Sequence, residues 1–124
     1  MTTTKSIGIE GGDGDDTVDL KNIIAKSLAV VLGDGDDELT LENVAATKKL
    51  VIAGGLGNDT PELKLVSAAA LEVLLAAGDD EISLDTVLIG TKTKIDGGKD
   101  ANTYTDLGNN TLAALNRLNF QTIV

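Results

Sequence analysis

The fold is decided by one short stretch, Gly11-Gly12-Asp13-Gly14-Asp15-Asp16-Thr17-Val18-Asp19. Related stretches follow at 32–40, 54–62, 75–83 and 97–105, and their last acidic position moves from Asp16 to Asp37, Asp59, Asp80 and finally Asn102. The steps between these positions are 21, 22, 21 and 22 residues. A fixed period in this range, with glycines and apolar residues in every repeat, is typical of a solenoid in which each repeat forms one coil.

Apolar residues alternate with polar ones on both sides of each Gly/Asp turn. Alternation at period two indicates a strand with one buried face. A third short apolar segment, such as Asn22-Ile23 or Asn43-Val44, completes the repeat, so we expect three short strands and three corners in each coil. Asn suits a corner because it tolerates left-handed backbone dihedrals. Two inward columns are predicted, one formed by Val30, Ile52 and Val73 and the other by Leu41, Leu63 and Leu84.

Superposing the repeats predicts coils at about 6–26, 27–48, 49–69, 70–91 and 92–113, in a single domain. Residues 114–124 are expected to form a partial coil or a short capping helix. The predicted fold is an all-β, right-handed parallel β-helix of about five coils, because the coils are longer than those of hexapeptide helices. A β-roll-like or left-handed solenoid is the alternative.

One segment, Ala68–Ala77, has a composition that favours a helix when it is considered alone. Its Leu71 and Val73 nevertheless fall in register with Leu50 and Ile52 of the preceding repeat. Because the register extends over five copies, we predict a strand here.

The overall composition narrows the range of functions. The chain of 124 residues has a net charge of −10, so nucleic acid and anionic membrane surfaces are unfavourable partners. It has no Cys, which excludes disulfides and thiolate chemistry, and no apolar run long enough for membrane insertion. Tyr104 and Phe120 are the only aromatic residues, so a narrow aliphatic interior is expected.

The first Gly/Asp stretch matches the pattern G-G-x-G-x-D-x-U-x at Gly11, Gly12, Gly14, Asp16 and Val18. The chain therefore resembles the RTX calcium-binding repeats of secreted bacterial proteins, and also the repeats of large bacterial cell-surface β-helix proteins. The resemblance covers about nine residues in each coil, and the motif occurs once per coil rather than in tandem. It implies that one edge, at most, binds Ca²⁺, through Asp13, Asp15, Asp16, Asp34, Asp36, Asp37, Asn58, Asp59, Asp79 and Asp80.

Elementary chemistry allows calcium at this edge and also allows a purely structural role. Carboxylates beside turn carbonyls offer the all-oxygen ligands that Ca²⁺ prefers. Stacked carboxylates about 5 Å apart repel by roughly 1 kcal/mol in water and by about 3–4 kcal/mol at an effective dielectric near 20, which a cation would offset. Alternatively, the side chains accept hydrogen bonds from turn amides and their charge discourages aggregation.

Two other activities are disfavoured by the residue content, and the chain is not expected to be an enzyme. Paired carboxylates can hydrolyse glycosides, but there is no His, Arg117 is the only Arg, and few aromatic residues are available to stack sugars. Ice binding would need a regular Thr ladder, whereas the relevant column alternates between Thr and Glu at Thr17, Glu38, Thr60, Glu81 and Thr103.

The expected function is that of a structural repeat segment in an exported bacterial surface or adhesin-like protein. The alternative is a metal-independent scaffold whose coils stack end to end. Met1–Lys5 lacks a signal-peptide core, so an extracellular or cell-surface protein would have lost its leader. We also expect a homo-oligomer through the exposed N-terminal coil, arranged head to head, because a β-helix end presents unpaired backbone groups.

Overall fold

The computed structural model describes residues 1–124, and all of its regular elements are strands. None of them is a helix that could cross a membrane. In chain order the strands are β1 (Ser6–Glu10), β2 (Thr17–Val31), β3 (Glu38–Leu56), β4 (Thr60–Ala77), β5 (Glu81–Asp96), β6 (Thr103–Gly108), β7 (Thr111–Leu112), β8 (Leu115–Leu118) and β9 (Thr122–Ile123).

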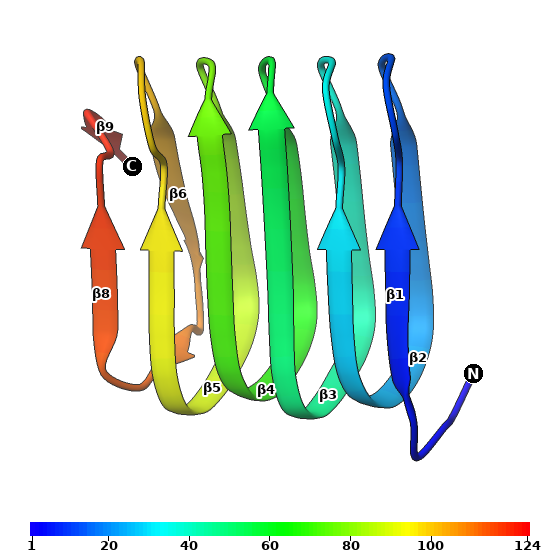
Figure 1. Cartoon of the computed structure of the whole chain (residues 1–124). Coiled ribbons are helices and arrows are strands. Elements are labelled where there is room, and N and C mark those ends of the chain that lie inside the picture. Colours follow the sequence, from blue (N-terminus) through cyan, green and yellow to red (C-terminus); the bar gives the residue numbers. More distant parts are fainter.

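The strands form one parallel sheet that winds into a right-handed solenoid. The sheet order is β1-β2-β3-β4-β5-β6-β9, with β7 and β8 both paired to β5. In Figure 1 the chain rises along the near side, turns at the top and descends along the far side while it advances from right to left. Ile7 pairs with Leu28, and Leu28 pairs with Leu50, so each coil uses 21 or 22 residues as the repeat predicts. The predicted all-β, right-handed parallel β-helix is confirmed.

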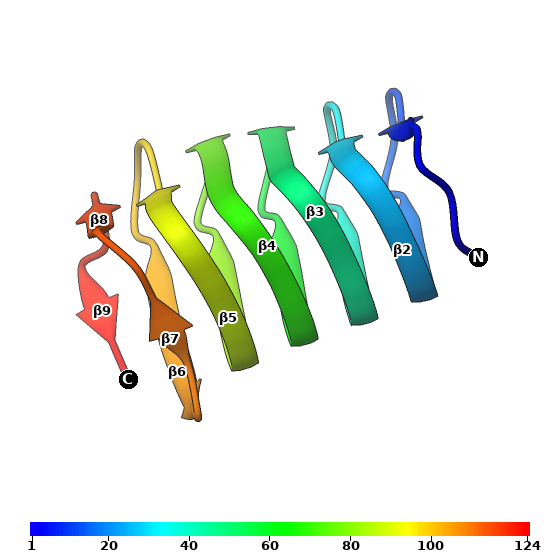
Figure 2. The ribbon, with the colours of Figure 1, turned by 90° about the horizontal axis from the view of Figure 1, so that it is seen from below.

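Each coil has three sides, although one long strand passes through two of the corners. Along β2, residues 17–21, 23–25 and 27–31 pair with β3, and the residues between these segments, Asn22 and Lys26, do not. Asn22 and Asn43 have φ values of 57° and 54°, the left-handed conformation expected of a corner Asn. Viewed from below, the lower sides of successive coils lie side by side (Figure 2).

The interior consists of aliphatic columns that run along the solenoid axis. Val30, Ile52 and Val73 pair in successive coils and are fully buried. Leu41, Leu63 and Leu84 form the second predicted column, which is also fully buried. The Ala-rich segment 68–77 lies within β4, so cross-coil pairing overrides its helical propensity.

The C-terminal tail is a partial coil, and the alternative of a capping helix is wrong. β8 pairs with Thr93–Asp96, and β9 pairs with the start of β6. The tail covers Tyr104, whose ring meets Phe120 edge-on at a centroid distance of 5.6 Å. The guanidinium of Arg117 lies 4.7 Å from the centre of the Tyr104 ring.

The N-terminal residues cover one side of the first coil. The backbone amide of Thr3 donates to the carbonyl of Ile24 at 2.8 Å, and the amide of Ile24 donates to the carbonyl of Met1 at 2.8 Å. Met1–Thr3 therefore satisfies part of the backbone edge of the first coil that the sequence led us to expect as unpaired. The N-terminal edges of β1 and of residues 17–21 have no neighbouring strand in this chain.

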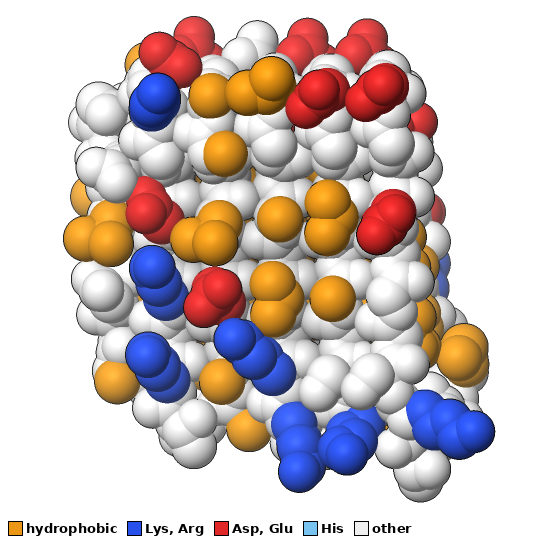
Figure 3. All heavy atoms as spheres, in the orientation of Figure 1, with side chains coloured by type: hydrophobic (Ala, Val, Ile, Leu, Met, Phe, Trp, Pro, Cys, Tyr) orange, Lys and Arg blue, Asp and Glu red, His pale blue; other side chains and the backbone are white.

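On the face shown in Figure 3, acidic side chains lie along much of the upper edge, where the Gly/Asp turns are, and most basic side chains gather toward the lower edge. Apolar side chains and a few acidic ones lie between them. Two exposed ion pairs, Lys21–Glu42 and Lys49–Glu72, each have an N–O distance of 3.7 Å and contribute little to stability.

Candidate functional site

The Gly/Asp turns stack tightly at the upper edge because glycine occupies the positions that need it. Gly33 and Gly35 have φ values of 99° and 125°, a region that side chains rarely adopt. A Cβ atom at Gly33 would collide with the carbonyl oxygen of Gly12 in the preceding coil. Glycine at these two positions therefore permits both the turn and the close approach of neighbouring coils.

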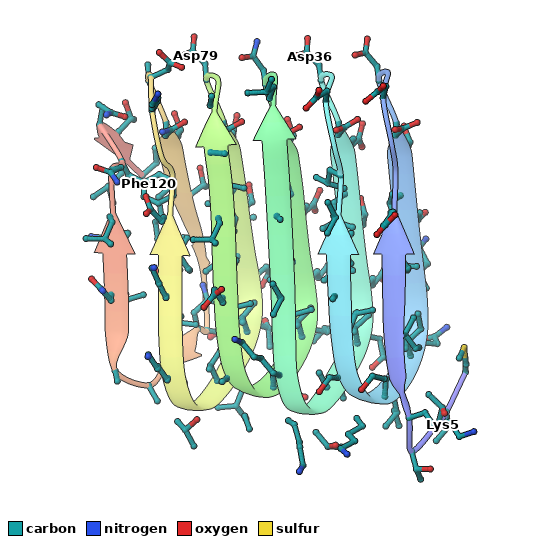
Figure 4. All side chains as sticks on the ribbon, viewed as in Figure 1. Lys5, Asp36, Asp79 and Phe120 are labelled. Carbon is teal, nitrogen blue, oxygen red and sulfur yellow. The ribbon has the colours of Figure 1, made fainter.

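The predicted site residues lie in three rows along this edge. The inner column is buried in its middle and consists of Asp16, Asp37, Asp59 and Asp80. The outer column is exposed at the tips of the turns and consists of Asp15, Asp36, Asn58 and Asp79, of which Asp36 and Asp79 are labelled in Figure 4. The third row, Asp13 and Asp34, is a pair of exposed residues joined by a backbone bridge, and apolar Leu56 follows it in the next coil.

In the inner column, every carboxylate after Asp16 accepts a hydrogen bond from the backbone of the preceding coil. The amide of Asp16 donates to Asp37 Oδ1 at 2.7 Å. The amide of Asp37 donates to Asp59 Oδ1 at 3.1 Å, and that of Asp59 donates to Asp80 Oδ1 at 2.7 Å. One oxygen of each of these three acceptor carboxylates is thus bound to a backbone amide.

The outer column runs in the opposite direction. The amide of Asp36 donates back to Asp15 Oδ1 at 2.8 Å, and the amide of Asn58 donates back to Asp36 Oδ1 at 2.7 Å. The amide of Asp79 continues the series by donating to Asn58 Oδ1 at 2.8 Å. Either Asp or Asn can occupy the outer column, because the hydrogen bond from the next coil's backbone amide requires only an acceptor oxygen.

The second carboxylate oxygens of the inner column are buried without a hydrogen-bond partner. This holds for Oδ2 of Asp16, Asp37, Asp59 and Asp80. Burial raises the pKa of Asp59 to about 7, a shift that the amide of Asp37 opposes and the carboxylates of Asp80, Asp37 and Asp36 reinforce. Burial likewise raises the pKa of Asp80 to about 6, helped by Asp79 and Asp100 and opposed by the amide of Asp59. A buried acceptor without a donor is costly, so each of these oxygens needs a proton, a hydrogen-bond donor or a cation beside it.

The donor chemistry of the inner column fits a hard cation, although the carboxylates do not gather into a cluster. No three acidic side chains converge on one point. Beside Gly11 and Gly54, the free carboxylate oxygen of the inner column lies near a backbone carbonyl oxygen of the next coil, and we call this position a seat. In coils 2 and 4, Leu32 and Leu75 stand in place of the glycine. At Gly54, for example, an added Cβ would meet both Asp59 Oδ2 and the carbonyl oxygen of Leu75. Oxygen-only surroundings of this kind suit Ca²⁺ rather than a transition metal.

Comparison with protein-family models, with curated proteins and with solved structures gives no match. The corner is therefore interpreted from its own chemistry.

The sequence reasoning missed the residues that end the inner column. Asn102 is fully buried, accepts the amide of Asp80 on Oδ1 at 2.9 Å, and donates its own amide to Gln121 Oε1 at 2.7 Å. Coil 5 carries an amide where the other coils carry a carboxylate, and the structure shows that Asn102 continues the column. Gln121 carried no signal, because it lies 19 residues after Asn102 and outside the period.

Proposed function

We propose that this chain is a structural segment of an exported bacterial surface protein, a rigid rod whose Gly/Asp corner is stabilised by calcium. The observation that carries the proposal is the row of buried, unpartnered carboxylate oxygens along the inner column. A structural module gains nothing from burying such groups unless a partner satisfies them. Calcium supplies positive charge and accepts oxygen ligands from both carboxylates and carbonyls.

The surroundings of the inner column support a cation rather than an internal basic residue. The charged side chains that influence Asp59 are all carboxylates, namely Asp80, Asp37 and Asp36. Extracellular calcium modules work with dissociation constants of about 0.1–1 mM, so a modest site would be loaded outside the cell. The resemblance to RTX repeats points in the same direction.

Thermal unfolding in calcium and in chelator tests the proposal. Saturating calcium should stabilise the fold by RT ln(1 + [L]/Kd), about 2.7 kcal/mol at a hundredfold excess over Kd. Magnesium at the same concentration is the control, because it loses its water reluctantly and demands a tighter octahedral site. A melting temperature that is the same in millimolar calcium and in chelator would contradict the calcium role and leave the aspartates as hydrogen-bond acceptors only.

The second candidate is a scaffold that stacks end to end without metal. It is favoured by the unpaired edges of β1 and of residues 17–21, and by Ile7, Ile9, Val18 and Leu20, which are only partly buried at this end. Such edges are templates for another strand. Association should weaken in Ile7→Lys but not in the control Ile123→Lys at the opposite end, where the residue is 54% exposed. Sedimentation that finds only monomer up to about millimolar concentration would contradict this function.

A further inference from the structure

The same seat occurs beside Gly11, Gly54 and Gly97, in coils 1, 3 and 5. A carboxylate oxygen lies there in coils 1 and 3, and an amide nitrogen in coil 5. In coil 5, a Cβ added at Gly97 would meet Asn102 Nδ2 at 2.8 Å and the carbonyl oxygen of Asn119 at 2.6 Å. At Gly54 the corresponding atoms are Asp59 Oδ2 and the carbonyl oxygen of Leu75. At Gly11 they are Asp16 Oδ2 and the carbonyl oxygen of Leu32. The register of the coils therefore superposes the Asn102 amide nitrogen on the free carboxylate oxygens.

The hydrogen bonds of the inward side chain are complete in the asparagine seat and incomplete in the aspartate seats. Asn102 Nδ2 donates to the carbonyl oxygens of Lys99 at 3.0 Å and Asn119 at 3.2 Å, so every polar atom of its side chain is satisfied. Asp59 Oδ2 occupies the equivalent position, but it is an acceptor that faces a carbonyl oxygen and is left without a partner. The aspartate oxygens therefore have neither a hydrogen-bond donor nor a cation beside them, whereas the asparagine side chain needs no further partner.

We propose that Asn102 is a built-in replacement for a bound cation: its amide nitrogen does in coil 5 what a calcium ion does beside Asp16 and Asp59. This inference rests on the proposed calcium role of the corner. The calcium-dependent part of the solenoid then ends at coil 4, and the C-terminal coil is closed without metal. Gln121 extends the same column by accepting the amide of Asn102, which again requires no ion.

The charge of the inward side chain also differs between the two kinds of seat, because Asp59 is a buried acid and Asn102 is a buried neutral amide. A neutral amide in the same place brings no charge into the interior and supplies the missing donor. Replacing an inner aspartate by asparagine should therefore satisfy its seat and remove its need for calcium.

Reciprocal substitutions test the inference, with melting temperature and calcium stoichiometry as readouts. In chelator, Asp59→Asn should raise the melting temperature by about 5 °C, because a buried unpaired acceptor becomes a donor. It should also bind less calcium than the parent chain in equilibrium dialysis and show a smaller calcium-induced rise. Asn102→Asp should do the reverse, melting lower in chelator and recovering when calcium is added.

The matched control is Asp19→Asn in β2, outside the two aspartate columns, where the side chain is exposed. It should leave melting in chelator and the calcium response close to those of the parent. The inference is overturned if the parent responds to calcium and Asp59→Asn keeps the full response and stoichiometry. If the parent itself shows no response, the proposed calcium role fails first, and a higher melting temperature of Asp59→Asn would then identify a seat that needs only a hydrogen-bond donor.

Discussion

Replacing Ile52 with Ala should be among the most damaging single changes in the interior. Ile52 is fully buried at the middle of an inward column, and its neighbours Val30 and Val73 are fully buried as well. Its backbone pairs with both neighbouring coils, so the strands cannot close over the cavity that is left. Truncation of buried Ile to Ala costs about 2–5 kcal/mol, and the loss grows as the site becomes less able to collapse. We therefore expect about 4 kcal/mol, or a fall of about 15 °C in melting temperature.

The measurement is denaturant unfolding followed by far-UV circular dichroism, with the parent, Ile52→Ala and Ile24→Ala compared under the same ionic conditions. Ile24, in the first coil, is 47% exposed, so its truncation should change the free energy of unfolding by only about 0.5 kcal/mol. A loss below about 0.5 kcal/mol for Ile52→Ala, or one no larger than that of Ile24→Ala, would refute the column described here.

Two further predictions concern the turns and the charged column. Gly33→Ala should lower the free energy of unfolding by at least about 2 kcal/mol, because φ is 99° and the new Cβ would strike the Gly12 carbonyl. Gly8 has open space around it, so Gly8→Ala should raise the free energy of unfolding by about 0.5 kcal/mol in the same assay. In calcium-free buffer, the free energy of unfolding should fall as pH rises from about 4 to about 7, because the raised pKa of Asp59 favours its protonated form in the folded state. Asp59→Asn should make the melting temperature depend less on pH. If the pH dependence is the same in this variant as in the parent, Asp59 does not carry a buried charge.

The period of the sequence was sufficient to predict the register of the interior. Because side chains alternate strictly in a strand, one aligned turn places every apolar residue of the neighbouring coil, and Leu41, Leu63 and Leu84 pair as expected. The corner residues Asn22 and Asn43 were also predictable, because Asn tolerates a positive φ. Leu65 and Thr86 take the same conformation at the next two corners, with φ values of 53° and 56°, so there the stacking of coils overrides residue preference, as it does in the Ala-rich segment of β4.

The detailed chemistry of the corner could not be predicted from spacing. Asp36 and Asp37 are adjacent in sequence, yet one accepts an amide from the following coil and the other from the preceding coil. That choice depends on which face of the turn each side chain takes, and not on residue type. For the same reason, spacing alone did not reveal which oxygens are buried without a partner, or that Asn102 fills its seat.

The two ends of the solenoid differ in their inward columns. At the N-terminal end the columns begin with apolar Ile7, Ile9, Val18 and Leu20. At the C-terminal end Asp106 pairs with Leu84 and is exposed, and Arg117 pairs with Ile95 and lies on the Tyr104 ring. A further coil stacked on this end would bury both charges, which is costly unless each is paired. At this end Asn102 and Gln121 complete the hydrogen bonds of the inner column, and Asp106 and Arg117 put charged groups in line with the apolar columns. Any continuation of the β-helix by another coil is chemically easier at the N-terminal end.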